Sequence, residues 1–111
     1  MAETLVSRQS KAAEVRLAGV KRVAVVPAFN EACAVAEVVS EIHVADEGMD
    51  VVVIDDGSRD ATAAAAQRAG AAIVRMPFNV GIGGAMQTGY RYALEHGYEI
   101  AAELSEDDRG A

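Results

Sequence analysis

The chain has 111 residues, which is enough for one domain or part of one. Hydrophobic residues make up 51% of the chain and charged residues 24%, a balance that is typical of a folded globular protein. The formal net charge of −7 argues against a nucleic-acid-binding surface, because such a surface needs clustered Lys and Arg.

The first 20 residues form a polar extension, and we expect the folded part of the chain to span residues 21–111. The extension lacks the apolar core that a secretory signal peptide needs. No run approaches the roughly 18 apolar residues of a membrane span. Cys33 is the only cysteine, so no internal disulfide can form, and we expect it to be a small buried helix residue. These features favour a cytoplasmic protein, which could also act at the inner face of the membrane.

Short apolar runs alternate with segments of helical periodicity along the folded part of the chain. Continuous apolar runs are typical of strands buried on both faces. They predict strands at residues 23–26, 51–54, 71–74 and, more weakly, 99–104. The periodicity predicts helices from Ala32 to just before Gly48, from Ala61 to Ala69, and from beyond Gly84 to His96.

Residues at the ends of these elements support the assignment. Pro27 is predicted to end the first strand. Asp60 is a suitable N-cap for the second helix, and Gly70 a suitable C′ glycine after it. The third helix is predicted to carry one apolar face, made of Met86, Tyr90, Ala93 and Leu94.

Alternating strands and helices predict an α/β fold with an open parallel sheet. In such sheets ligands bind at the carboxyl ends of the strands, so the distinctive polar residues should follow strands. They do so in this sequence. Residues 27–31, PAFNE, follow the first strand, residues 55–58, DDGS, the second, and residues 79–84, NVGIGG, the third.

These loops favour a nucleotide sugar over a dinucleotide as the ligand. A dinucleotide fingerprint needs glycines after the first strand, whereas Gly81 and Gly83 follow the third and Met86 occupies the next required position. A nucleotide base presents N–H groups from which a carboxylate can accept hydrogen bonds. A diphosphate needs a cation, Mg²⁺ or Mn²⁺, and a glycine-rich loop lets the backbone approach the ligand closely.

Three segments together resemble the N-terminal half of a family 2 glycosyltransferase. They read VVPAFNEACAVAEVV, VVVIDDGSRDAT and RMPFNVGIGGAMQTGYRYALEHGYEI, and the match covers about residues 21–100. The subgroup most resembled is the dolichol- or polyprenyl-phosphate sugar transferases. The resemblance implies the open-sheet, Rossmann-like half of a GT-A nucleotide-diphospho-sugar transferase fold.

The resemblance also implies a role for each matching residue. Asp56 matches the carboxylate that reads the N–H of the base, and Asp55 would mainly bond the amides of its own loop. Arg75 is a weaker candidate for charge support near the phosphates. The residues that match the loop lining the nucleotide pocket are Pro27, Phe29, Asn30 and Glu31, and those that match the loop beside the nucleotide and donor sugar are Asn79, Gly81 and Gly83.

The expected metal-binding segment departs from the family pattern. The family carries an Asp-x-Asp motif after the fourth strand, whose aspartates hold the divalent cation. Ser105 aligns with the first aspartate and Asp107 with the second, so Asp107 is the candidate metal ligand. The acceptor half and the catalytic base of the family do not follow before Ala111. We therefore expect a truncated domain with weak activity or none by itself.

Two functions are compatible with these observations. The first is a glycosyltransferase that binds a nucleoside-diphosphate sugar and transfers the sugar to a polyprenyl phosphate or another acceptor. The second is a non-catalytic remnant that only binds the nucleotide. Calorimetry with nucleotides and Mn²⁺ shows whether the chain binds a nucleotide, and a sugar-transfer assay distinguishes the enzyme from the non-catalytic remnant.

Overall fold

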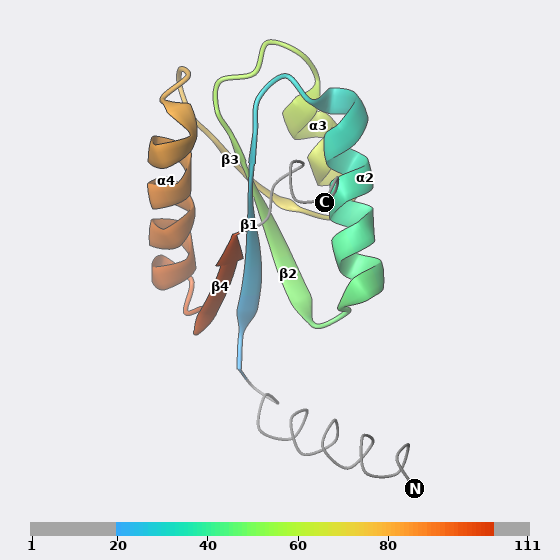
Figure 1. Cartoon of the computed structure of the whole chain (residues 1–111), viewed down its shortest axis with the longest axis vertical. Helices are drawn as coiled ribbons and strands as arrows, with labels where there is room; N and C mark the ends of the chain where they lie inside the picture. The colour runs from blue at the N-terminus through green and yellow to red at the C-terminus, as the bar shows by residue number, and fades with distance from the viewer. Residues whose placement is uncertain (1–19, 104–111) are drawn as a thin grey trace, which may run out of the picture.

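Four parallel strands form an open sheet that is covered by helices on both faces (Figure 1). The computed structural model describes residues 20–103. The elements, in chain order, are β1 (Arg22–Ala28), α2 (Ala32–Ala45), β2 (Met49–Asp55), α3 (Thr62–Arg68), β3 (Ala72–Arg75), α4 (Gly81–Glu95) and β4 (Ile100–Glu103). The strand order is β3-β2-β1-β4, and each neighbouring pair is parallel. The α/β fold with an open parallel sheet is confirmed.

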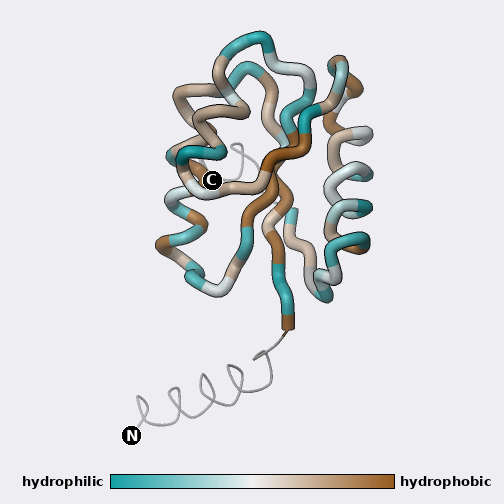
Figure 2. The backbone as a smooth tube through the Cα atoms, turned by 180° about the vertical axis from the view of Figure 1, so that it is seen from behind, coloured by the Kyte–Doolittle hydropathy of each residue, from teal (hydrophilic) through white to brown (hydrophobic). Residues whose placement is uncertain are grey.

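The central strands are buried on both faces because they separate two hydrophobic clusters. On β1, Val23 and Val25 face the cluster with α4, whereas Ala24 and Val26 face the cluster with α2 and α3. Figure 2 shows the hydrophobic colour concentrated along these strands. Each fully buried Val contributes about 1.5–3 kcal/mol relative to an exposed one. A continuous apolar run is therefore the sequence that this position in the fold requires.

Helix α4 is rotated relative to the predicted apolar face. Met86 and Ala93 are buried as expected, but the side chain of Tyr90 is 45% exposed and that of Leu94 is 80% exposed. A Cβ atom at Gly89 would lie 2.2 Å from Cγ1 of Val25, so this glycine lets the helix approach β1 closely. Close packing of small residues on the sheet has prevailed over burial of the larger apolar ones.

Two predictions were wrong, one on the N-cap of the second helix and one on the burial of Cys33. Helix α3 begins at Thr62, and Ala61, not Asp60, occupies its N-cap position. Cys33 is exposed, because α2 turns Val35, Val38 and Val39 toward the sheet and leaves Cys33 outside. The expected C′ glycine fits the structure, since Gly70 has a φ of 105°.

Pro27 does not end β1, which continues through it to Ala28. The pairing with β4 reaches only from Arg22 to Val25, so among the described residues the end of β1 has a neighbour on one side, β2. Proline is tolerated at such a position because a missing N–H leaves no ladder partner unsatisfied there. No helix within residues 20–103 is both long and apolar enough to cross a membrane.

Candidate functional site

Three loops meet at the carboxyl edge of the sheet, at the top of Figure 1. The strand register brings their starting points to the same level, because Ala28 pairs with Asp55 and Asp55 pairs with Arg75. We call them the first loop (residues 29–31), the second loop (residues 56–61) and the third loop (residues 76–80). Every predicted nucleotide-binding residue lies in these loops or at the adjoining ends of β1, β2 and α4.

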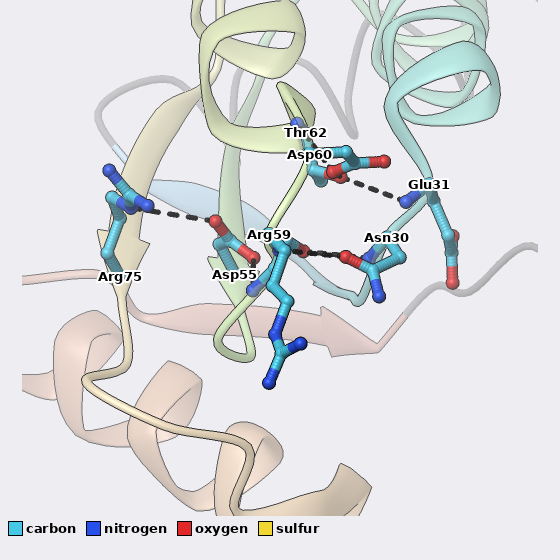
Figure 3. A network of polar contacts seen from close by, with 8 residues as sticks. Asn30, Glu31, Asp55, Arg59, Asp60, Thr62 and Arg75 are labelled. Carbon is cyan, nitrogen blue, oxygen red and sulfur yellow. Dashed lines mark hydrogen bonds and ion pairs between the residues drawn. The ribbon is translucent and has the colours of Figure 1, made fainter.

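The first and second loops are joined by reciprocal hydrogen bonds around Asn30. The backbone N–H of Asn30 donates to Oγ of Ser58 at 2.8 Å. The backbone N–H of Arg59 in turn donates to Oδ1 of Asn30 at 2.9 Å (Figure 3). Asn30 has a φ of 51°, a left-handed conformation that asparagine adopts more readily than most residues. The side chain and the conformation of Asn30 therefore both suit its place in the first loop.

A second pair of contacts joins the start of α2 to the start of α3. The backbone N–H of Glu31 donates to Oγ1 of Thr62 at 2.9 Å, and that of Ala32 donates to Oδ2 of Asp60 at 3.2 Å. The Thr62 hydroxyl in turn donates to Oδ1 of Asp60. This hydroxyl, followed by the backbone amides that Asp60 accepts from, lowers the pKa of the Asp60 carboxyl, because each contact stabilises the ionised form.

Asp55 is buried and holds the second loop from within. Its side chain is 1% exposed, and Oδ1 accepts a hydrogen bond of 3.0 Å from the backbone N–H of Ser58. Oδ2 lies 3.6 Å from Nε of Arg75 and has no hydrogen-bond partner within the described part of the chain. Arg75, from the end of β3, thus offsets the charge of a carboxylate that water does not reach (Figure 3).

Asp56 joins the second loop to the third. Its carboxylate accepts hydrogen bonds from the backbone N–H groups of Val80 at 2.8 Å and Gly81 at 2.9 Å. These groups belong to the start of α4, where the helix dipole favours a negative charge. Asp56 is 5% exposed, so in this structure the carboxylate lies beneath the loops and faces their amides.

Two glycines of the site have positive φ angles but different surroundings. Gly57 has a φ of 82°, and a Cβ atom there would lie 2.7 Å from the backbone nitrogen of Asn79. The third loop therefore rests directly on the second. Gly81 has a φ of 87°, and a Cβ atom there would meet nothing within 4 Å. The same open space surrounds Gly83, so the start of α4 is accessible from outside.

The remaining predicted residues line the outside of this assembly. Phe29 is 43% exposed, Asn79 is exposed, and Pro27 and Glu31 are half-buried. Three contributors were missed by the sequence reasoning, namely Ser58, Asp60 and Thr62. Their signal was present in the string SRDAT, where small hydroxyl side chains flank an aspartate directly before a helix.

The residues at this edge do not by themselves form a metal site. Within residues 20–103 no three His, Cys, Asp or Glu side chains are grouped so that they could hold a metal ion. The candidate metal ligand Asp107 and its neighbour Ser105 lie outside the described residues. The side chains of residues 20–103 thus do not by themselves complete a site for a divalent cation.

Comparison with known proteins decides the family. The sequence model of glycosyl transferase family 2 matches residues 23–98, which is more than half of the chain. The chain belongs to this family. The matched segment begins within β1 and ends before β4, so it contains all three loops of the candidate site.

The most informative relatives are longer than this chain. The chain is 38% identical over 84 residues to an uncharacterised protein of Methanocaldococcus jannaschii, covering 75% of this chain and 34% of that protein. It is 30% identical over 88 residues to the undecaprenyl-phosphate mannosyltransferase of Micrococcus luteus, covering 75% of this chain and 36% of the relative. The chain therefore spans about a third of the length of these relatives.

A solved structure shares the fold. Glucosyl-3-phosphoglycerate synthase from Mycobacterium tuberculosis, in complex with Mn²⁺, UDP-glucose and phosphoglyceric acid, superposes with a TM-score of 0.65 at 26% identity. The similarity covers 83% of this chain and 35% of that one. The expected GT-A fold is confirmed for the part of the chain that the comparison covers.

Proposed function

We propose that the chain binds a nucleoside-diphosphate sugar at the carboxyl edge of its sheet, as the nucleotide-binding part of a glycosyltransferase. The observation that carries this proposal is the convergence of three family-matched loops on one edge, each fastened to the next by side chains. The structural relative that holds UDP-glucose has the same fold, which supports a ligand of this class.

Roles for individual residues follow from the site and the family resemblance. Asp56 would accept a hydrogen bond from the N–H of the base. This is possible because each carboxylate oxygen accepts from only one amide and keeps a further lone pair. Asp56 is nearly buried beside the second and third loops, so the base would have to pack directly on these two loops to reach its carboxylate. Asp55 would hold the second loop in place through Ser58.

The outer residues would contact the rest of the donor. Phe29, Asn30 and Glu31, together with Pro27, would line the side of the pocket formed by the first loop. Gly81 and Gly83 offer a backbone that a diphosphate or a sugar can approach without meeting a side chain, next to Asn79.

The acceptor is proposed to be a polyprenyl phosphate, which is the acceptor class in the name of the Micrococcus luteus relative. In such a transfer an acceptor oxygen attacks the anomeric carbon and the nucleoside diphosphate departs. A lipid-linked acceptor would bring the protein to the inner face of the membrane. Structures of glucosyl-3-phosphoglycerate synthase contain Mn²⁺ in one case and Mg²⁺ in another, so Mg²⁺ or Mn²⁺ is the proposed cofactor, with Asp107 as the candidate ligand.

Isothermal titration calorimetry tests the proposal directly. The 111-residue chain is titrated with UDP and with GDP, each with and without Mn²⁺, and we expect saturable binding of one of them. Asp56→Ala should weaken that binding, whereas Asp46→Ala, at the opposite edge of the sheet, should not. The proposal would be rejected if neither nucleotide binds with a Kd of about 1 mM or lower, which corresponds to a binding free energy of about 4 kcal/mol. A transfer assay with a polyprenyl phosphate then separates an enzyme from a nucleotide-binding module.

A further inference from the structure

Helix α2 begins without a cap from its own sequence. Its N-cap residue, Glu31, makes no capping hydrogen bond through its side chain. The first amides of a helix have no intrahelical partner and need another acceptor. Here the acceptors come from the second loop and the start of α3, about 30 positions further along the chain. Oγ1 of Thr62 accepts from Glu31 at 2.9 Å, and Oδ2 of Asp60 accepts from Ala32 at 3.2 Å.

The direction of the Thr62 hydroxyl is determined by Asp60. An ionised carboxylate only accepts hydrogen bonds, so the single hydroxyl hydrogen of Thr62 must point at Oδ1 of Asp60. The lone pairs of the hydroxyl are then free to accept from Glu31 (Figure 3). Thr62 itself is fully buried, so water cannot replace this contact at its hydroxyl.

We propose that Thr62 and Asp60 are positioning residues for the nucleotide, which hold the first loop against the second. Neither residue needs to touch the ligand. They fasten the segment that carries Phe29, Asn30 and Glu31, which are candidates to line the pocket. This inference rests on the proposed function, because it concerns the same nucleotide site.

The chain offers a matched control at the opposite edge of the sheet. Asp46 resembles Asp60 in accepting a hydrogen bond from a backbone N–H two residues further on, that of Gly48 at 3.1 Å, where Asp60 accepts that of Thr62 at 3.0 Å. Asp46 also pairs with Arg22. Asp46→Asn therefore removes a comparable carboxylate without touching the three loops.

The experiment compares Thr62→Val, which keeps the shape but removes the hydroxyl, with Thr62→Ser, which keeps the hydroxyl. Thr62→Val removes both hydrogen bonds of the hydroxyl, and we expect the loss of the one that holds the first loop, from the Glu31 amide, to weaken nucleotide affinity roughly 5- to 10-fold. Thr62→Ser should retain affinity within about 2-fold. If Thr62→Val does not fold, Asp60→Asn replaces it as the test variant, because Asp60 is exposed. Asp60→Asn should weaken nucleotide binding, whereas the control Asp46→Asn should not. Equal affinities of Thr62→Val and Thr62→Ser, or of Asp60→Asn and Asp46→Asn, would overturn the inference.

Hydrogen exchange of the free chain provides a readout that needs no ligand. The amides of Glu31 and Ala32 should be protected in the wild type and in Thr62→Ser, and should exchange faster in Thr62→Val. If the wild type binds no nucleotide, the proposed function fails and the role in binding fails with it. The exchange rates then still decide whether Thr62 holds the first loop. Unchanged exchange in Thr62→Val would overturn that step by itself.

Discussion

The carboxylate of Asp56 and the backbone amide of Gly81, 25 positions further along the chain, are joined by a hydrogen bond of 2.9 Å. With the parallel bond from Val80, it makes Asp56 the N-terminal acceptor of α4. The same residue is the candidate reader of the nucleotide base. Folding of the glycine-rich segment and recognition of the base would therefore depend on one side chain.

Replacement of Asp56 should affect stability and binding together. Asp56→Ala leaves two backbone N–H groups without their acceptor, and we expect the free energy of unfolding to fall by about 1–3 kcal/mol. Urea denaturation measures this loss. Asp56→Asn retains one acceptor oxygen and should lose less stability, yet should still weaken nucleotide binding, since an amide offers one acceptor atom where the carboxylate offers two. Wild-type stability of Asp56→Ala would show that the amides of α4 find other partners.

Two glycines allow two costs of a Gly→Ala substitution to be measured separately, namely strain in the backbone and a clash of the added methyl group. Gly57 and Gly81 have φ angles of 82° and 87°, but only at Gly57 would a Cβ atom clash, 2.7 Å from the backbone nitrogen of Asn79. Gly81→Ala should cost about 1 kcal/mol of unfolding free energy from backbone strain alone. Gly57→Ala should cost about 1–3 kcal/mol more, because the third loop must move. Thermal denaturation of both variants checks the ranking, and equal losses would mean that the second and third loops are not in contact at Gly57.

The order of elements and the meeting of the three loops of the candidate site at one edge of the sheet could be predicted from the sequence. Runs such as residues 51–54 predicted strands because a strand between two helical layers can carry only apolar residues. The meeting of Asn30, Asp56 and Asn79 followed from one rule, that parallel strands end at the same edge. This rule needs no knowledge of contacts between side chains.

Contacts that depend on the final distance between elements could not be predicted. Asp60 was predicted as the N-cap of the nearest helix, α3; its Oδ1 does accept the first amide of α3, that of Thr62, but its Oδ2 also accepts from Ala32 at the start of α2, about 30 positions earlier. Tyr90 and Leu94 were expected on the buried face of α4, but Gly89 lets the helix approach β1 along a different face. In both cases tertiary packing adds to or outweighs the local preference.

Stability at alkaline pH should depend on Tyr98. Burial, followed by the hydrogen bond of 2.5 Å that its hydroxyl donates to Oδ2 of Asp50, raises the pKa of Tyr98 in the folded state. In the unfolded chain the pKa is about 10. The stabilisation is therefore fully present below about pH 10 and is lost as the pH rises toward the folded-state value.

We expect the free energy of unfolding of the wild type to fall as the pH rises above about 10, and that of Tyr98→Phe to fall less. Urea denaturation at several pH values measures both slopes. Asp50→Asn keeps the tyrosine but removes the carboxylate, and its slope should be intermediate. Identical slopes for the wild type and Tyr98→Phe would show that the Tyr98 hydroxyl is not held by Asp50 in solution.

Replacement of Gly83 should have opposite effects on stability and on nucleotide affinity. It lies in the first turn of α4, and a Cβ atom there would meet nothing within 4 Å. Alanine is the better helix former, so Gly83→Ala should raise the free energy of unfolding by up to about 1 kcal/mol. If the nucleotide sugar approaches this backbone as proposed, the added methyl group should nevertheless lower its affinity. Urea denaturation and calorimetry on the same preparation give both values. Higher stability with unchanged affinity would remove Gly83 from the site, and lower stability would mean that the space above α4 is filled in solution.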